Sequence, residues 1–250
     1  MYQFFVESEA IQGKTVMITG EDVNHIKNVL RMKPGEEISV KCAEERKEYR
    51  CGIEEITEDM VRCTLYFIKE DGVELPSSIY LFQGLPKADK MEMIIQKAVE
   101  LGVCEIIPMA TKRAVVKLDE KKAAAKVSRW QAISEAAAKQ SKRAYVPKIH
   151  LPMSFSQALE YAKTKEVKFI PYEMAEGMDC TRKLIEDILP GQEIAVFIGP
   201  EGGFEEKEIE EAKKQGIQPI TLGKRILRTE TAGLTVLAWL MYLLEGKNIL

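Results

Sequence analysis

The chain has 250 residues, 46% of them apolar, with a formal net charge of -3; this is enough apolar material for a sizeable core and excludes a disordered chain. No apolar signal region follows Met1, and the longest apolar stretch, 234–244, is too short to span a bilayer, so we expect a cytoplasmic protein without a membrane segment. Five scattered cysteines without a CxxC pair, and only two histidines, argue against a disulfide framework, a metal site and a Ser-His-Asp relay.

The charges are distributed unevenly along the chain. Residues 1–75 carry 10 basic and 16 acidic side chains, residues 76–150 carry 14 and 7, and residues 151–250 carry 12 and 16. A basic middle in an acidic protein is able to steer a polyanion to one place. A solvated helix face would explain the same charges equally well.

Short β-prone runs dominate the chain up to residue 70. They are closely spaced and bounded by turn residues, which is typical of a small barrel. The expected strands are 15–19, 37–42, 49–56 and 61–68, with one amphipathic helix at 22–31. The polar stretch 70–78 ends this region, so we divide the chain into domains 1–72 and 73–250.

Strands and helices alternate in the rest of the chain. Ser154 and Gln157 have the spacing of a capping box at the start of one of these helices. The expected strands are 79–82, 103–107, 167–172, 194–198 and 219–222, and the other expected helices are 88–101, 121–141, 181–189, 205–215 and 229–245. This order predicts an α/β domain with a mainly parallel sheet.

The loop Gly199-Pro-Glu-Gly-Gly-Phe204 follows the expected strand 194–198. Ligands of open parallel sheets bind beyond the carboxyl ends of the strands, and glycines permit a close backbone approach. We interpret this loop as a backbone cradle for a flat or anionic ligand, although an ordinary turn would also use glycine. Its sequence matches neither GxxxxGK[ST] nor GxGxxG, which disfavours phosphate-loop and dinucleotide binding.

A second unusual loop, 222–232, leads into the last expected helix. Thr229 is a candidate N-cap, and the charge of Glu230 complements the positive end of the helix. Capping does not explain the apolar pair 226–227, which lies between two arginines. Aliphatic side chains facing an adenine would account for this mixture.

Both loops resemble a family signature. IGPEGGF at 198–204 and LGKRILRTETA at 222–232 are similar to the signature of the RsmE family of small-subunit (16S) ribosomal RNA methyltransferases, in the SPOUT superfamily. Three further motifs follow the family order: HIKNVLRMKPGEEI (25–38), KADKMEMIIQKAVELGV (87–103) and RWQAISEAAAKQSKRAYVPKI (129–149). Five motifs in one order, covering nearly the whole chain, argue against an accidental match.

The resemblance implies a fold and a reaction. The expected fold is an N-terminal PUA-like small β-barrel that binds RNA and a C-terminal SPOUT α/β domain with a trefoil knot, assembled as a homodimer. The expected reaction transfers a methyl group from S-adenosylmethionine to N3 of a uridine conventionally numbered 1498, in small-subunit ribosomal RNA within the assembled subunit. The resemblance places cofactor contacts at Gly199, Glu201, Gly202, Leu222, Gly223, Ile226, Leu227 and Ala232.

The reaction needs alignment and an unprotonated uridine N3, because the sulfonium already makes the methyl group electrophilic. A carboxylate base or a cation that stabilises the developing anion would help, and the candidates are Glu201, Arg228 and Glu230. Glu230 as a helix-end charge and Arg228 as a phosphate clamp are equally good interpretations.

Residues 112–148 hold 11 basic and 3 acidic side chains and form the strongest candidate RNA surface. Arginine binds phosphate in bidentate fashion and stacks on bases. The predicted RNA contacts are Arg31, Arg113, Arg129, Lys139, Gln140, Lys142 and Arg143, with Lys33 and Lys41 as weaker candidates. Trp130 and Tyr145 are able to stack on RNA, but a core position is the better prediction for Trp130 in an Ala-rich amphipathic helix.

Two other functions fit the same residues. A non-catalytic RNA-binding protein would use the barrel and the basic helix, with the glycine loop as structure only. A SPOUT methyltransferase acting on tRNA or large-subunit RNA would use every motif on another substrate. Cofactor binding distinguishes the non-catalytic RNA-binding protein from a methyltransferase. Analysis of the methylated nucleosides after incubation with each RNA class distinguishes the possible substrates.

Overall fold

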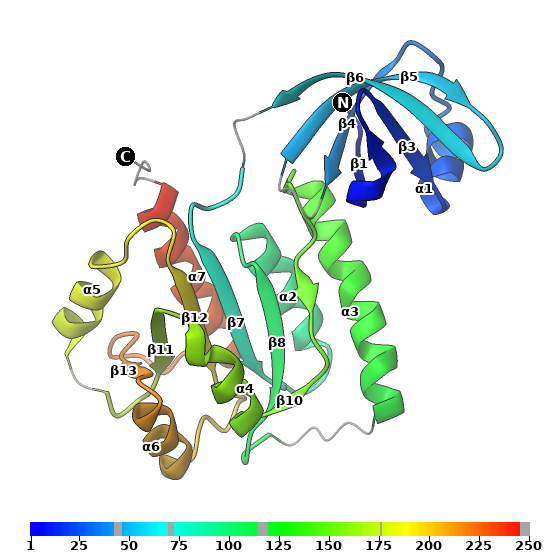
Figure 1. The fold of residues 1–250 in the computed structure, drawn as a ribbon. Helices are drawn as coiled ribbons and strands as arrows, with labels where there is room; N and C mark the ends of the chain where they lie inside the picture. The colour runs from blue at the N-terminus through cyan, green and yellow to red at the C-terminus, as the bar shows by residue number, and fades with distance from the viewer. Residues whose placement is uncertain (43–46, 70–72, 115–119, 176, 246–250) are drawn as a thin grey trace. The chain divides into compact units, whose positions relative to one another are not determined.

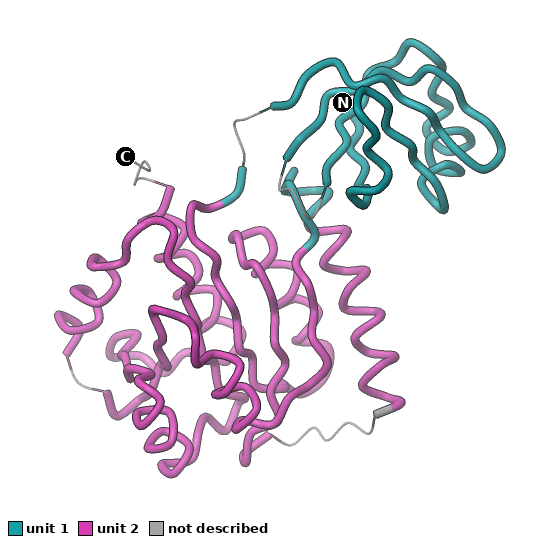
Figure 2. The backbone as a smooth tube through the Cα atoms, viewed as in Figure 1, with its two compact units in different colours: residues 1–74, 138–146 teal, residues 75–137, 147–250 magenta. Residues whose placement is uncertain are grey.

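The computed structural model describes residues 1–42, 47–69, 73–114, 120–175 and 177–245. The chain forms two compact units, which Figure 2 distinguishes by colour. Unit 1 contains residues 1–74 and 138–146, and unit 2 contains residues 75–137 and 147–250. A segment of the predicted second domain thus packs with the first, while the functional division after residue 72 stays a proposal.

Unit 1 is a six-stranded sheet in the order β1-β4-β5-β6-β3-β2 (Figure 1). Its strands are β1 (Gln3–Val6), β2 (Ile11–Gln12), β3 (Thr15–Thr19), β4 (Glu37–Cys42), β5 (Lys47–Ile56) and β6 (Met60–Lys69). The four predicted strands are confirmed within two residues at each end. Sequence reasoning missed β1 and β2, because runs of four and two residues are too short to show alternation.

The predicted helix 22–31 is split into two forms. An α-helical turn, α1 (Glu21–Asn24), continues as a π-helical turn, η2 (His25–Val29), in which the Leu30 amide donates to the His25 carbonyl at 2.8 Å. Val23 and Ile26 are buried in the core of unit 1. Arg31 ends the segment with a positive φ of 53°, a left-handed conformation that a residue with a side chain rarely adopts.

Unit 2 is built on a seven-stranded sheet in which every pair of strands is parallel. The main path runs β10-β8-β7-β12-β11-β13, and β9 pairs with β8. The strands are β7 (Ser78–Gly84), β8 (Glu105–Ala110), β9 (Lys148–Ile149), β10 (Met153–Ser154), β11 (Val167–Pro171), β12 (Glu193–Ile198) and β13 (Gln218–Ile220). The parallel α/β sheet predicted from the alternation of elements is confirmed.

The helices of unit 2 lie near their predicted positions. They are α2 (Lys90–Glu100), α3 (Glu120–Gln140), α4 (Phe155–Tyr161), α5 (Met178–Glu186), α6 (Glu206–Lys214) and α7 (Thr229–Glu245), and the last residues of α3 belong to unit 1. Ser154 accepts from the Gln157 amide, which confirms the capping box of α4. The first turn of α5 was missed, because its Gly177 start carries no side-chain cap.

Alternate side chains of the central strands face opposite layers of helices. Phe82 and Phe197 stack with their rings 4.3 Å apart and share a core cluster with residues of α4 and α6. Gln83 and Ile198, one residue further along each strand, approach Gly233 of α7. This alternation fixes which strand residues reach the start of α7.

Among the described residues, no helix is long and apolar enough to cross a membrane. The same residues include no group of three or more His, Cys, Asp or Glu side chains arranged to hold a metal ion.

Candidate active site

A cavity of about 510 Å³ lies beyond the carboxyl ends of the unit 2 strands. Its walls are the loop 199–204 after β12, the loop 221–228 between β13 and α7, and residues 171–173 at the end of β11. The eight residues predicted to contact a cofactor all line this cavity: Gly199, Glu201, Gly202, Leu222, Gly223, Ile226, Leu227 and Ala232. The structure therefore brings together two loops that are separated by sixteen residues in sequence.

The end of β7 packs directly against the glycine loop, residues 199–204. A Cβ atom added to Gly84 would lie 2.6 Å from the backbone nitrogen of Pro200 and 2.9 Å from the carbonyl carbon of Gly199. The backbone of β7 thus touches the loop at a position where no side chain fits. At the other end of the loop, Gly203 has a positive φ of 67° and its amide donates to the Pro200 carbonyl.

The Thr229 hydroxyl ties the glycine loop to α7. It donates to the carbonyl oxygen of Gly199 at 2.5 Å and accepts from the buried side-chain amide of Gln83 at 2.9 Å. The expected N-cap role needs correction, because Thr229 is already the first residue of α7. Its side chain serves a contact between segments rather than the end of its own helix.

Three charged side chains meet at the start of α2. The Lys90 ammonium lies 3.0 Å from Glu201 Oε1 and 3.4 Å from Glu230 Oε2, and the amide of Lys87 also donates to Glu201. Burial alone would raise the pKa of Glu201, but the hydrogen bonds from Lys90 and from backbone amides bring it below the ordinary value. The hydrogen bond to Glu201 raises the pKa of Lys90 against a smaller opposing effect of burial.

Sequence reasoning assigned no role to Lys90, although it belongs to the motif 87–103. The signal was available in its position at the first turn of a helix that follows a sheet strand, the edge at which ligands bind. Lys90 and Glu201 line the cavity directly, whereas Glu230 lies behind them with 14% of its side chain exposed.

Arg113 contacts the glycine loop, residues 199–204, on the side away from Lys90. Arg113 donates to the Gly202 carbonyl at 3.0 Å, and a Cβ atom on Gly202 would lie 3.1 Å from Arg113 Cβ. The segment before Arg113 is fixed by the buried carboxylate of Glu208, which accepts from the amides of Lys112 at 3.0 Å and Glu205 at 2.9 Å. One side chain of α6 therefore positions both loops that approach Gly202.

The cavity combines backbone, aliphatic and charged surfaces. Ile226 is 87% exposed, which is unusual for a large apolar side chain unless a ligand covers it. The charged side chains in the wall are five basic and two acidic: Lys90, Arg113, Lys224, Arg225, Arg228, Glu173 and Glu201. The volume and this mixture fit a nucleoside that carries both a planar base and charged groups.

The candidate RNA contacts are distributed over both units. Arg113 lies in the cavity wall, Arg129 pairs with Glu92 while staying 68% exposed, and Lys139 pairs with Asp22. Arg31, Gln140 and Lys142 are exposed. These positions leave each residue within reach of solvent, and their contact with RNA stays a prediction.

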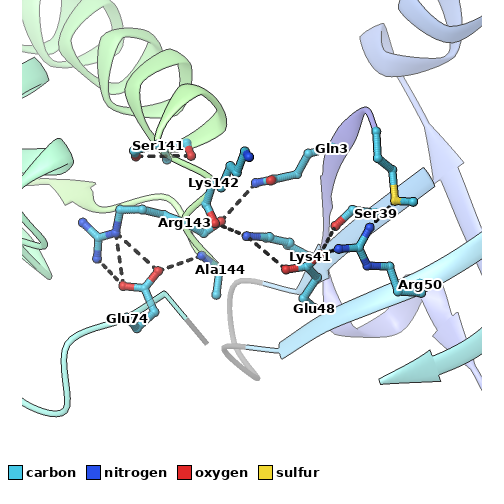
Figure 3. A network of polar contacts seen from close by, with 12 residues as sticks. Gln3, Ser39, Lys41, Glu48, Arg50, Glu74, Ser141, Lys142, Arg143 and Ala144 are labelled. Carbon is cyan, nitrogen blue, oxygen red and sulfur yellow. Dashed lines mark hydrogen bonds and ion pairs between the residues drawn. The ribbon is translucent and has the colours of Figure 1, made fainter. Parts of the chain in front are cut away.

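Arg143 is different, because it is buried. Only 3% of its side chain is exposed, and its guanidinium donates to Glu74 at 2.6 Å (Figure 3). The guanidinium also lies over the ring of Tyr145. Such a guanidinium is not placed to reach a phosphate, so we leave Arg143 out of the RNA surface proposed below. Trp130 is also buried, which confirms the core position expected for it.

The end of α3 is fastened to the sheet of unit 1 by a polar network (Figure 3). Lys142 adopts a positive φ of 61°, and the amides of Lys142 and Arg143 bond back to the helix in a Schellman motif. The Lys142 carbonyl accepts from the buried ammonium of Lys41. Burial lowers the pKa of Lys41, against the opposing effect of Glu48. Lys41 therefore has a structural partner within unit 1.

Two protein-family models match the chain. Residues 73–241 match an RNA methyltransferase domain, and residues 18–66 match an RNA methyltransferase PUA domain. The chain is 39% identical over 251 residues to the ribosomal RNA small subunit methyltransferase E of Bacillus subtilis, covering 98% of both proteins. It is 37% identical to that of Mesomycoplasma hyopneumoniae, covering 95% of this chain and 97% of the relative.

A solved relative has the same fold. The ribosomal RNA small subunit methyltransferase E of Neisseria gonorrhoeae, determined with bound S-adenosylmethionine, superposes with a TM-score of 0.82 at 32% identity over 97% of this chain and 98% of that one. The matched part includes residues of both units. The chain therefore belongs to the RsmE family of ribosomal RNA small subunit methyltransferases, which joins a PUA domain to a SPOUT methyltransferase domain.

Proposed function

We propose that the protein methylates N3 of the uridine conventionally numbered 1498 in 16S ribosomal RNA, with S-adenosylmethionine as methyl donor. One observation carries the proposal: the two signature loops form a single cavity whose wall contains all eight predicted cofactor contacts. The N. gonorrhoeae relative was solved with this cofactor. Relatives over nearly the full length of the chain are named small-subunit methyltransferases.

The cavity residues would hold the cofactor in distinct ways. The backbone of Gly199, Gly202 and Gly223 allows a ligand to approach closely, because these residues carry no side chain. Leu222, Ile226, Leu227 and Ala232 supply apolar contacts for the adenine. When bound, the cofactor supplies a methyl group on a sulfonium, which makes that carbon electrophilic.

The chain itself must orient the uridine and favour loss of its N3 proton. Glu201, Arg228 and Glu230 are the proposed catalytic residues. Glu201 accepts hydrogen bonds from Lys87 and Lys90. These bonds stabilise its ionised form, so Glu201 is better suited to electrostatic stabilisation than to accepting a proton. Arg228 is exposed in the cavity wall and is able to bind a phosphate of the substrate.

The proposed RNA contacts are exposed basic and polar residues of the two units, each considered by itself. They are Arg31, Arg113, Arg129, Lys139, Gln140 and Lys142. The positive charges would position phosphates, and the sequence of the RNA would be read elsewhere. A homodimer, a trefoil knot and action on the assembled small subunit complete the proposal, all from the family resemblance, and a cytoplasmic location is proposed with them.

The decisive test is methyl transfer from labelled S-adenosylmethionine. Small subunits that lack the modification should accept one methyl group, and mapping should place it on N3 of uridine 1498. Naked 16S RNA, tRNA and large subunits provide the comparison substrates. Preferential labelling of tRNA or large subunits would refute the substrate, and failure to bind the cofactor in calorimetry would favour a non-catalytic RNA-binding protein.

A further inference from the structure

Lys90 presents a fixed positive charge to the cavity. Its ammonium hydrogen-bonds Glu201 Oε1 at 3.0 Å and forms an ion pair with Glu230 Oε2 at 3.4 Å. A lysine ammonium has three N–H donors, so at least one donor remains beside these two carboxylates. The two partners come from different segments, the glycine loop and α7, and they hold the ammonium in place before a ligand arrives.

Lys90 acts as a cation rather than a base. The same hydrogen bonds that hold its ammonium raise its pKa, so it stays protonated throughout the physiological pH range. Lys90, Glu201 and Glu230 together carry one net negative charge. Arg113 and Arg228 line the same cavity and offset that charge. The surroundings of Lys90 are thus compatible with an anion.

The other basic side chains of the cavity are placed differently. Arg113 donates to the carbonyl of Gly202, whereas Lys224, Arg225 and Arg228 are exposed on the loop before α7. A preorganised donor stabilises developing charge better than a mobile one, because it need not be ordered during the reaction. Lys90 is the cavity cation that two carboxylates hold in position.

We propose that Lys90 is a catalytic residue that donates its remaining N–H to a carbonyl oxygen beside N3 of the target uracil and stabilises the uridine anion. The proposal rests on the function proposed above. The N3 proton leaves to solvent, and the N3 electron pair then forms the bond to the methyl carbon. The carbon–sulfur bond breaks with its electron pair on sulfur, which leaves S-adenosylhomocysteine and neutral 3-methyluridine. In this mechanism Glu201 and Glu230 act through Lys90 as positioning residues for its ammonium, in place of the direct catalytic roles proposed for them above.

The test compares single-turnover methylation of small subunits by the wild type and by Lys90→Met, between about pH 6.5 and about pH 9.5. Near neutral pH the variant should be slower by about 100-fold, the usual loss for one donor to a developing anion. This deficit should shrink as the pH rises, because N3 then ionises without help. Lys90→Arg should retain part of the rate, and Lys97→Met, on the same helix outside the cavity, should match the wild type.

Calorimetry provides a readout that does not depend on turnover. The S-adenosylmethionine affinity of Lys90→Met should stay within about threefold of the wild type. Subunits assembled on 16S RNA that contains 5-fluorouridine, whose N3 is more acidic, should restore most of the lost rate. If Lys90→Met unfolds because its two carboxylates repel each other, Lys90→Gln keeps polar donors beside them and undergoes the same measurements.

Several results would overturn the proposal. A deficit of equal size at every pH would make Lys90 a positioning residue, and an unchanged rate would give it no role. A large loss of cofactor affinity would assign it to the cofactor site. The proposed function fails separately: a wild-type enzyme that leaves the subunit unmethylated refutes that function, whereas an active wild type with a normal Lys90→Met variant refutes the Lys90 role alone.

Discussion

The two edges of the unit 2 sheet are built in opposite ways. The carboxyl edge is open, with glycines, a cavity and an exposed Ile226. Near the amino edge, charged side chains are enclosed in mutual contacts. Glu105 Oε2 lies 2.6 Å from His150 Nε2 and accepts from the Tyr161 hydroxyl at 2.7 Å.

A second carboxylate continues this closed cluster near the amino edge. Glu193 accepts from the Tyr80 hydroxyl at 2.6 Å and from Lys165 at 3.1 Å, and the Lys165 ammonium lies 3.8 Å from the centroid of the Tyr80 ring. Polar groups that satisfy each other stabilise a fold but leave little to offer a ligand. A charged cluster therefore indicates a ligand site only where a cavity and unused hydrogen-bond donors lie beside it.

The largest expected effect belongs to Gly202→Val at the open edge. A Cβ at this position would already lie 3.1 Å from Arg113 Cβ, and the valine branches would add to that crowding. We expect cofactor binding in calorimetry to become undetectable, a loss of more than about 1000-fold in affinity. Thermal unfolding should remain cooperative. A normal affinity for S-adenosylmethionine would show that this loop does not contact the cofactor, and the contrast between the two edges of the sheet would then be wrong.

Gly84→Ala should have the next largest effect. Its Cβ would meet backbone atoms of Pro200 and Gly199, which cannot rotate away as a flexible side chain would. The glycine loop must shift, so we expect cofactor affinity to fall by about 100-fold, or roughly 2.7 kcal/mol. An affinity within about threefold of the wild type would show that the loop tolerates displacement.

Lys165→Met tests the closed edge. In the wild type the Lys165 side chain is only 10% exposed, and the change leaves the Glu193 carboxylate without this ammonium partner. Because Glu193 keeps the Tyr80 hydroxyl and is partly solvated, we expect a loss of about 2 kcal/mol in the free energy of unfolding. Cofactor affinity should not change. Weakened cofactor binding without a loss of stability would reverse the roles of the two edges.

Acidification should lower the stability that the charged cluster near the amino edge of the sheet contributes. Burial opposes the charge of Glu105, but hydrogen bonds from His150 and Tyr161 outweigh burial and lower its pKa below the ordinary value of 4.5. A carboxylate with a lowered folded-state pKa contributes stability above its unfolded pKa and loses it as the pH falls through the folded value. Urea unfolding below pH 4.5 should therefore show a decline in stability that is less steep in Glu105→Gln than in the wild type. Parallel pH profiles would contradict this.

The smallest effect is expected for Ala88→Gly. Ala88 has a positive φ of 55°, beside the Lys87 amide that holds Glu201. The left-handed conformation costs an alanine about 1 kcal/mol relative to glycine, so the variant should be more stable by up to that amount. Denaturant unfolding measures the gain. A destabilised variant would mean that the methyl group of Ala88 contributes packing.

Periodicity was enough to predict most of the fold. The strands 15–19 and 37–42 and the helix 229–245 have the predicted bounds, because long amphipathic or alternating runs carry their own signal. The two-residue strands β9 and β10 were missed, because their pairing with β8 depends on distant residues. The trefoil knot, which depends on the path of the chain, stays a prediction from the resemblance.

The candidate site was predictable where backbone chemistry defines it. Glycine-rich turns after sheet strands point to a cavity whatever the rest of the fold does. Side-chain partners were harder to predict. Arg143 and Lys90 are both basic residues in family motifs, yet one is buried against Glu74 and the other faces a cavity. Sequence spacing does not reveal which carboxylate a long side chain will meet.

Residues 138–146 pack with unit 1 although they follow most of α3, and unit 1 therefore depends on them. The amide of Ala144 and the guanidinium of Arg143 complete contacts with Glu74, and Lys142 does so with Lys41. A fragment cut after residue 74 would expose Glu74 and the buried Lys41 without these partners. Residues 1–74 alone are therefore expected to fold less stably than the same residues together with 138–146.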